Sequence, residues 1–219
     1  ESFDPAAVPG NKKITFDHGD GEQIIFTMLK RDLPRQCPDD WQICDLEDGN
    51  VEVTASAVSD YLIESHYELA AKAAGQLPTG FKPEDHYNSR FHPRTLQMTL
   101  LGSSDAIHSM GIDWAKVAEQ VRPDEVGVYS SSALGQMSEE GFGGLLQGRL
   151  RGVRTTAKQV PLGLNSMPAD FVNAYVLGSV GHTEAITGAC ATFLYVLQAA
   201  VRDIRSGRRR VAILGNAEA

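Results

Sequence analysis

The stretch that decides the fold is GHTEAITGACATFLYVLQAAVRDIRSGRRRVAILGNAEA, residues 181–219. Near its start, Thr183, Ala185, Ile186 and Thr187 are short or β-branched residues that suit an extended strand. Gly188 and Ala189 then let the backbone turn sharply, because neither carries a bulky side chain. A helical segment follows, and Val211–Leu214 has the apolar, β-branched composition of a short buried strand. The order strand, turn, helix, strand predicts an α/β fold.

The segment between those two strands is predicted to be a helix. It has no Gly or Pro from Ala191 until Gly207, and its apolar residues recur at helical spacing. Those apolar residues are Phe193, Leu197, Val201 and Ile204. Long polar side chains occur only in the second half, so we expect the first two turns to be buried and the far end exposed. Gly207 is placed to end the helix in a left-handed conformation.

Cys190 lies where this helix is expected to begin. The unpaired N–H groups and the dipole of a helix N-terminus favour a thiolate, by at most about 2 kcal/mol. Burial opposes the charge and can outweigh that gain. Position alone therefore does not make Cys190 reactive, and a nucleophile here would need a nearby histidine or another cation. His182 precedes the strand, and its position predicts packing or solvent exposure instead of catalysis.

Length and composition bound the class of protein. The chain has 219 residues, of which 42% are hydrophobic, enough for a sizeable core. No apolar run approaches the roughly 20 residues that cross a bilayer, so no membrane segment is predicted. The cysteines are Cys37, Cys44 and Cys190, an odd number without zinc-type spacing, which favours a reducing cytoplasm over a disulfide framework. The chain stops straight after a core strand, so we expect it to be a piece of a longer protein.

Charge divides the chain into two regions. Residues 1–89 contain 7 Lys and Arg against 17 Asp and Glu, whereas residues 90–219 contain 13 against 11. We place a boundary between these regions and expect an N-terminal extension of mixed α/β character over residues 1–89. In this extension a hairpin is predicted around residues 18–21, and a strand at Val51–Val58. The net charge of −8 argues against nucleic-acid binding.

The elements between the boundary and the opening stretch are predicted from local patterns. Residues 75–93 contain three prolines and are expected to form an ordered loop. Helices are expected at Arg94–Met110 and Trp114–Val121, and a strand at Val126–Ser130. Asn165-Ser166 has the composition of a helix N-cap. No group of side chains has convincing metal-ligand spacing, so no metal site is predicted.

A basic stretch lies within residues 141–169, a segment without Asp or Glu. Its cations are Arg149, Arg151, Arg154 and Lys158. Without further context, exposed basic residues of this kind form an ordinary solvated surface.

Several segments, in order and at compatible spacing, are VGVYSSSALG, GFGGLLQGRLRG, NSMPADFVNAYVLGSVG and TGACATFLYVLQAAVRDIRSGRRRVAILGNAEA. Together they resemble the β-ketoacyl-[acyl-carrier-protein] synthases, the condensing enzymes of fatty-acid and polyketide synthesis. The runs GQLPTGF, YNSRFHP and ITGACATFLY are most similar to a longer bacterial branch. The resemblance implies a thiolase-like α/β fold whose cysteine-bearing N-terminal half spans residues 90–219. It also implies that the second half, with two catalytic histidines and a lysine, lies outside this chain.

The same resemblance implies a decarboxylative Claisen condensation. Cys190 would accept an acyl group from a carrier thioester, and its backbone N–H would contribute to the oxyanion hole. Malonyl-carrier protein would then lose CO₂ and attack the acyl group. The implied partners are acyl carrier protein, acyl and malonyl thioesters, and a second copy of the chain across a two-fold axis beside Thr183–Thr187. Arg149, Arg151, Arg154 and Lys158 would dock the acidic carrier, and no cofactor or metal is implied.

Two alternatives remain open. One is a related condensing enzyme, such as an initiating synthase or a thiolase that uses coenzyme A esters. The other is a non-catalytic, condensing-enzyme-like subunit that serves dimerisation or carrier docking. Cys190 argues against the chain-length-factor type of subunit, which typically replaces the cysteine. Acyl chain length and the choice between fatty-acid and polyketide synthesis are not encoded in these motifs.

Overall fold

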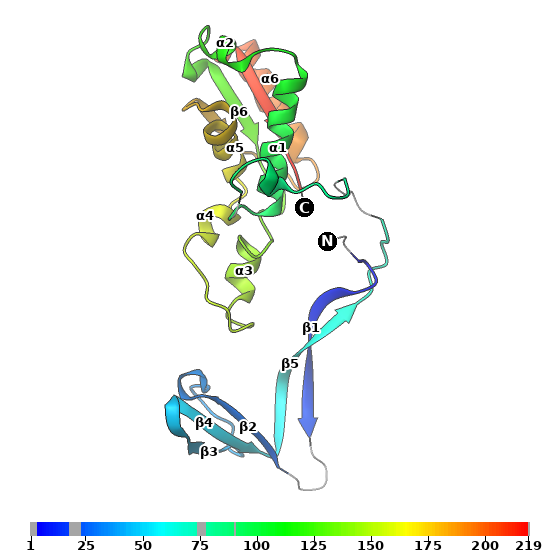
Figure 1. The fold of residues 1–219 in the computed structure, drawn as a ribbon, viewed down its shortest axis with the longest axis vertical. Helices are drawn as coiled ribbons and strands as arrows, with labels where there is room; N and C mark the ends of the chain where they lie inside the picture. The colour runs from blue at the N-terminus through cyan, green and yellow to red at the C-terminus, as the bar shows by residue number, and fades with distance from the viewer. Residues whose placement is uncertain (1–3, 18–22, 74–77, 90, 219) are drawn as a thin grey trace. The chain divides into compact units, whose positions relative to one another are not determined.

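A computed structural model describes residues 4–17, 23–73, 78–89 and 91–218. The chain folds as two compact units, Glu1–Leu77 and Pro78–Ala219, and most of their helices and strands are labelled in Figure 1. The turn predicted at residues 18–21 lies outside the described residues. The boundary predicted after residue 89 stays a prediction. Among the described residues, no helix combines the length and the apolar character needed to cross a bilayer.

The first unit is built from antiparallel strands. Its strands are β1 (Val8–Asp17), β2 (Ile24–Leu29), β3 (Gln42–Asp45), β4 (Asn50–Ala55) and β5 (Ala57–Tyr67). β1 pairs with β5, and β4 lies between β2 and β3 in a separate sheet. Short 3₁₀ turns at Lys30–Asp32 and Glu47–Gly49 flank β3. The described part of the segment for which mixed α/β character was expected thus contains strands and 3₁₀ turns.

The predicted pairing of the first two strands is wrong. The segments on either side of residues 18–22 are strands, but β1 and β2 belong to different sheets. The reason is the pattern of β4, in which Val51, Val53 and Ala55 are buried and alternate with polar residues. Across the ladder, these residues pair with the apolar positions of β2. The match of apolar faces, and not closeness in the sequence, selected the partner.

The second unit has an α/β architecture. Its α-helices are α1 (Arg94–Ser109), α2 (Trp114–Ala118), α3 (Phe142–Gln147), α4 (Gln159–Gly163), α5 (Met167–Phe171) and α6 (Thr192–Arg205). Its strands are β6 (Val126–Ser130), β7 (His182–Glu184) and β8 (Val211–Gly215). Helix α5 continues as a π-helix at Val172–Leu177, and 3₁₀ turns occur at Pro83–Asp85 and Pro123–Glu125.

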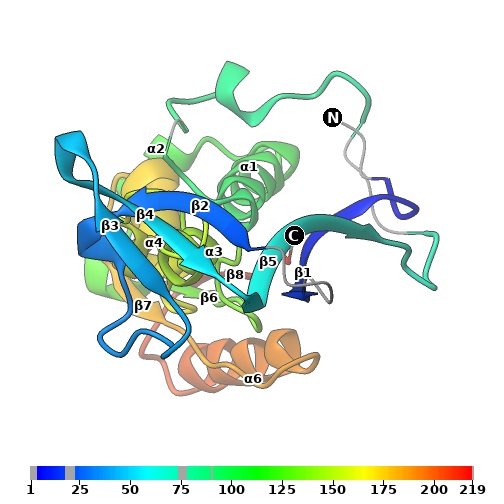
Figure 2. The ribbon, with the colours of Figure 1, turned by 90° about the horizontal axis from the view of Figure 1, so that it is seen from below.

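The strands of this unit form a parallel sheet in the order β7-β6-β8. Figure 2 shows α6 on one side of β6 and β8, with α1 on the other. Val126 and Val128 of β6 pack with Leu96 and Leu100 of α1, whereas Tyr129 packs with Val196 of α6 and its neighbours. Every residue of β6 is buried, as expected for a parallel strand covered on both faces.

Local patterns predicted several elements of this unit correctly. The strand Val126–Ser130 has the observed bounds, and the helix predicted at Arg94–Met110 is one residue shorter. The second helix is shorter than expected and ends at Ala118. Gly207 follows α6 with φ 74°, and the N–H groups of Gly207 and Arg208 bond back to the last helical turn in the geometry of a Schellman motif.

The buried face of α6 is not the predicted one. Its buried residues are Thr192, Val196, Ala199, Ala200 and Asp203. The stripe predicted to face the core, which includes Phe193 and Leu197, is exposed. The first two turns also carry exposed Leu194 and Tyr195, so the expectation of a fully buried N-terminal end is wrong. The cause is packing on one side only, because β6 and β8 cover the small residues and leave the large apolar residues uncovered.

Candidate active site

The carboxyl ends of the parallel strands bring together segments that are far apart in the sequence. β6 ends at Ser130, β8 ends at Gly215, and the chain beyond β7 runs through residues 185–187 to the turn that carries Cys190. In open α/β sheets, ligands bind beyond this edge. The turn 188–190 is therefore the first place to look for chemistry.

The turn is strained and tightly packed. Ala189 has φ 48°, a left-handed conformation that costs a residue other than glycine about 1–3 kcal/mol. A Cβ atom on Gly188 would lie 2.2 Å from the ring of Tyr195, so only glycine fits there. Thr192, which is fully buried, bonds to both residues: its Oγ1 accepts from the Gly188 N–H at 3.1 Å and donates to the Ala189 carbonyl at 2.7 Å.

Hydrogen bonds tie this turn to the loop that follows β6. Thr187 Oγ1 lies 3.0 Å from Ser131 Oγ, which also donates to the Asn165 carbonyl at 3.1 Å. Ser132 Oγ donates to Glu218 Oε2 at 3.0 Å, and the Ala133 N–H donates to the other oxygen of that carboxylate. The segments after β6, β7 and β8 thus form one connected framework.

Sequence reasoning missed most of this framework. Ser131, Ser132 and Glu218 were quoted within motifs but given no role. Asn165, expected to cap α5, instead donates its Nδ2 to the Ser132 carbonyl at 2.8 Å. Their positions in the sequence could have indicated a role. Each of these residues lies just beyond a predicted strand or just before a predicted helix.

Cys190 is exposed, which corrects the expectation of a buried cysteine. It lies two residues before the first residue of α6. Among the described residues, no histidine, lysine or arginine forms a hydrogen bond with its thiol. The cationic partner that the sequence argument required for reactivity is therefore not among the side chains bonded to Cys190 in the described part of the chain.

Comparison with known proteins identifies the family. A model described as "Beta-ketoacyl synthase, N-terminal domain" matches residues 49–219, which is most of the chain. The chain belongs to the β-ketoacyl synthase family. The match starts upstream of residue 90, where the motif resemblance began, and it includes β4 and β5 of the first unit.

The relatives include bacterial and fungal proteins. Beta-ketoacyl-[acyl-carrier-protein] synthase FabY of Pseudomonas aeruginosa is 51% identical over 217 residues, which cover 99% of this chain and 34% of that protein. The crystal structure of that noncanonical ketosynthase matches with a TM-score of 0.87 over 99% of this chain and 34% of that chain. The fatty acid synthase subunit alpha of Saccharomyces cerevisiae is 31% identical over 150 residues, 65% of this chain and 8% of its own length.

These comparisons confirm the thiolase-like α/β fold and the resemblance to a bacterial condensing enzyme. The chain spans about a third of the length of the FabY protein that it matches. The framework around Cys190 therefore lies in the N-terminal domain of a ketosynthase.

The predicted basic stretch is exposed, but its residues differ in their partners. Arg149 and Arg154 are exposed beyond α3. Arg151 forms an ion pair with Glu139, which precedes the acid-free segment. Lys158 lies over the ring of Phe91, 4.8 Å from its centroid. The charge of Arg151 is thus partly neutralised by Glu139, and the ammonium group of Lys158 already contacts an aromatic ring.

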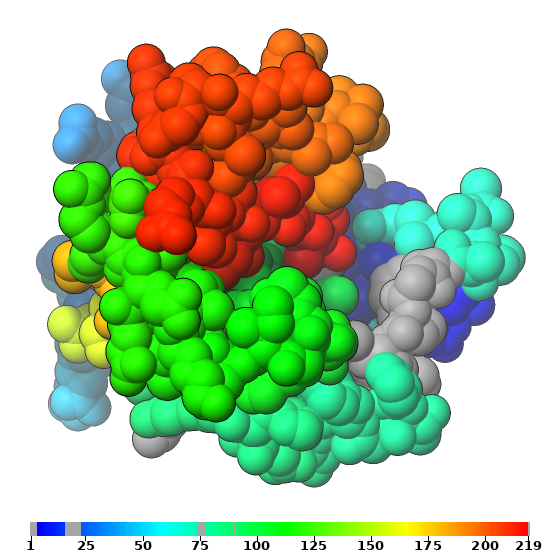
Figure 3. Space-filling view, turned by 90° about the horizontal axis from the view of Figure 1, so that it is seen from above, coloured from blue at the N-terminus to red at the C-terminus, as the bar shows by residue number. Residues whose placement is uncertain are grey.

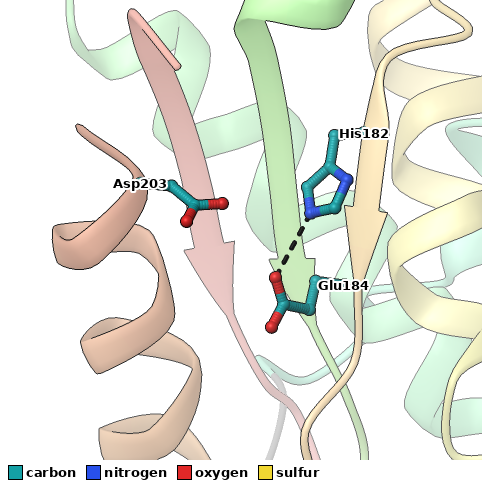
Figure 4. Close-up of side chains that lie close together, drawn as sticks. All are labelled: His182, Glu184 and Asp203. Carbon is teal, nitrogen blue, oxygen red and sulfur yellow. Dashed lines mark hydrogen bonds and ion pairs between the residues drawn. The ribbon is translucent and has the colours of Figure 1, made fainter. Parts of the chain in front are cut away.

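A separate polar cluster lies at the other end of α6. His182 Nε2 lies 3.2 Å from Glu184 Oε2 on β7, and Asp203 of α6 is close to both (Figure 4). The ligand atoms of these three residues lie within 4.8 Å of one another, which is close enough for a metal site. However, Arg202 contacts both carboxylates, with its Nε 3.0 Å from Asp203 Oδ1 and its Nη2 3.4 Å from Glu184 Oε2. The guanidinium already supplies the positive charge, so the cluster is better explained as an ion-pair network.

Asp203 is the buried centre of that network. The hydroxyl of Tyr129 donates to its Oδ2 at 2.9 Å, and Arg208 lies 3.7 Å from its Oδ1. Burial opposes the charge, but the bonds from Arg202 and Tyr129 outweigh it and lower the pKa of Asp203 below its ordinary value. Burial, together with the bond to this carboxylate, raises the pKa of Tyr129 to about 12. His182, expected to be packed or solvated, is half-buried beside Tyr129.

A pocket of about 200 Å³ lies near α2, away from Cys190. Trp114, Val121 and Leu177 are among its lining residues, none of which is titratable. Val126, the first residue of β6, also lines it, so it belongs to the amino end of the sheet. In the space-filling view, the orange and red atoms of α6 and β8 lie next to one another, and the green atoms of the α1–α2 region lie beside them (Figure 3). The pocket therefore has no titratable side chain that could act as an acid or a base.

Proposed function

We propose that this chain carries the nucleophile of a β-ketoacyl-[acyl-carrier-protein] synthase, and that Cys190 is that nucleophile. The observation that carries the proposal is the exposed thiol on a strained turn at the carboxyl edge of a parallel sheet. Membership of the ketosynthase family supports the same reaction class. The name of the fungal relative, fatty acid synthase subunit alpha, favours fatty-acid synthesis over polyketide synthesis.

The proposed reaction has two stages. First, the Cys190 thiolate attacks the acyl carbonyl carbon of an acyl-carrier thioester. The new C–S bond forms as the C–S bond to the carrier breaks, and the carrier sulfur takes up the proton that the Cys190 thiol gave up. Second, malonyl-carrier protein loses CO₂, and the electron pair of the broken C–C bond forms a carbanion at the α-carbon. This carbon attacks the Cys190 thioester, the C–S bond breaks, and the thiolate is released as β-ketoacyl-carrier forms.

Within this scheme, the turn orients the sulfur and a backbone donor together. The N–H of Cys190 is the proposed contribution of this chain to the oxyanion hole, since a donor next to the nucleophile is suited to stabilise charge on the acyl oxygen. The hydrogen bonds through Thr187, Ser131 and Glu218 hold the loops around the turn in place. The backbone donor is therefore already positioned before the reaction begins. Fixed donors of this kind lower the barrier without reorganisation during the reaction.

Covalent labelling tests the proposal. The complete natural polypeptide is incubated with an acyl-carrier substrate, and each cysteine is examined by peptide mass mapping. We expect the acyl group on Cys190, with Cys37 and Cys44 unmodified. A Cys190→Ala variant, which should take up no acyl group, serves as the control. Acylation of Cys37 or Cys44 with Cys190 free would overturn the assignment.

We also propose that the basic stretch helps to dock the acyl carrier protein. Exposed pairs contribute only about 0.2–1 kcal/mol each, so no single residue should decide binding. Arg149→Glu combined with Arg154→Glu should raise the KM for carrier-bound substrate several-fold, more at low salt. The control reverses the exposed Lys82 and Lys116, which lie outside the stretch. If a small thioester substrate loses activity equally, the role of the stretch is structural and not docking.

The proposed assembly is a homodimer in the cytoplasm. β7 forms one edge of the described sheet, so its outer side can pair with a second copy beside Thr183. Cys37, Cys44 and Cys190 are all free thiols, which supports a reducing compartment. Sedimentation of the complete polypeptide at micromolar concentration should give the mass of a dimer. A monomer at that concentration would contradict the proposed assembly.

A further inference from the structure

Thr192 is buried in the first turn of α6 and bonds to the backbone that carries Cys190. It has no exposed surface, and its hydroxyl both accepts from the Gly188 N–H and donates to the Ala189 carbonyl. The Ala189 carbonyl also accepts from the Thr192 N–H at 3.0 Å. These bonds involve both residues that immediately precede the cysteine.

The bonds matter because the turn is not held by its own conformational preference. Ala189 adopts φ 48°, from which a residue other than glycine tends to relax. Relaxation would rotate the Ala189–Cys190 peptide and swing both the thiol and the N–H of Cys190. The ring of Tyr195 lies beside Gly188, where an added Cβ atom would fall 2.2 Å from the ring. The hydroxyl of Thr192 is thus the side-chain group that bonds to the backbone on either side of the strained residue.

We propose that Thr192 is a positioning residue, whose hydroxyl maintains the left-handed turn and thereby sets the orientation of the Cys190 sulfur and N–H. The inference rests on the proposed role of Cys190 as the acyl acceptor. Thr192 does not touch the substrate. It acts through the Gly188–Ala189 backbone, and the methyl group of its side chain is not required.

The test compares variants that differ in the hydroxyl alone. Thr192→Val keeps the shape and removes the oxygen, whereas Thr192→Ser keeps the oxygen and removes the methyl group. Single-turnover acylation from an acyl-carrier substrate gives two quantities: the amplitude counts correctly folded sites, and the rate constant reports how they are oriented. A small displacement of a reacting group can cost about 100-fold. We expect the rate constant of Thr192→Val to fall by about 10- to 100-fold, and Thr192→Ser to retain the parent rate.

Thr99→Val is the matched control. Thr99 is also buried, and its hydroxyl also donates to a backbone carbonyl, that of Thr95 at 2.9 Å, but in α1 and away from the turn. This variant should lose stability without a change in the acylation rate constant. Modification of Cys190 by N-ethylmaleimide shows whether the thiol, which is exposed in this structure, stays accessible in each variant.

Each result has a defined meaning. An unchanged rate constant in Thr192→Val, or a loss of amplitude alone, would overturn the positioning role. If Thr192→Val does not fold, Thr192→Ala and Thr192→Ser form the comparison, since they differ by a single oxygen atom. Equal rates in that pair would likewise overturn the role. If the parent protein is not acylated on Cys190 at all, the proposed function fails and not the inference about Thr192.

Discussion

The two ends of α6 place polar groups in opposite environments. Before its first turn, Cys190 is exposed on a strained turn and has no charged partner among the described residues. Near its last turn, Asp203 is buried and receives bonds from Tyr129 and Arg202. One end keeps the thiol of the proposed nucleophile accessible at a cost in backbone strain, and the other end satisfies a buried charge. The comparison suggests that activity depends on the first end and stability on the second.

The largest expected effect is that of Cys190→Ala, which should affect activity and leave stability almost unchanged. Cys190→Ala should reduce condensation by at least about a thousand-fold, because it removes the proposed acyl acceptor. Its free energy of unfolding should change by less than about 0.5 kcal/mol, since exposed substitutions rarely matter. Steady-state kinetics and urea unfolding of the complete polypeptide measure both. A large loss of stability in this variant would remove the distinction between the ends.

Asp203→Asn should have the converse effect. It keeps the shape of the side chain but removes the charge that Arg202 and Arg208 approach. Hydrogen bonds to charged groups contribute about 1.5–3 kcal/mol, and the arginines are exposed enough to regain water, so we expect a loss of about 2 kcal/mol. The acylation rate constant of the remaining folded protein should be unchanged. A change in that rate constant would show that the network reaches Cys190 through the helix.

The pH dependence of the unfolding free energy tests the role of the Asp203 charge further. The pKa of Asp203 is lower in the folded protein, so the charge contributes stability above the ordinary aspartate pKa of about 3.9. That contribution is lost as the pH falls through the folded-state pKa. The difference in unfolding free energy between the parent and Asp203→Asn should therefore be constant near neutral pH and shrink below about pH 4. A difference independent of pH would mean that the charge has no part in it.

Tyr129→Phe should give the smallest effect. It removes the hydroxyl that donates to Asp203 and leaves the ring packed against α6. The loss should be about 1 kcal/mol, and it should be largely absent in the Asp203→Asn background because the two residues share one interaction. A double-mutant cycle by urea unfolding measures this coupling. Additive effects would indicate that the hydroxyl and the carboxylate act independently.

Much of the second unit could be predicted because its signals are local. An uninterrupted apolar run defined β6, helical spacing defined α1, and Gly207 marked the end of α6. The motif around Cys190 identified the turn and the family to which the comparisons assign the chain. These features depend on backbone preferences and periodicity within a few residues, so the sequence contains them directly.

The missed features depend on partners distant in the chain. The pairing of β1 with β5 joins residues that lie about 40 to 60 positions apart in the chain. Asp203 was assigned to the exposed end of the helix, and its burial became evident only when Tyr129 was placed beside it. Glu218 received no role because its bonds to Ser132 and Ala133 cross from one strand end to another. The spacing of residues along the sequence does not reveal such contacts.

The sequence by itself determined the α/β order of elements, the turn before α6 and the identity of the nucleophile candidate, because each depends on adjacent residues. Only the tertiary structure decided which face of α6 is buried. The apolar spacing of Phe193 and Leu197 predicted one face, yet the sheet packs against the small residues Ala199 and Ala200. Periodicity reports that a helix is amphipathic, whereas the layer that covers it is set by how closely the neighbouring strands can approach.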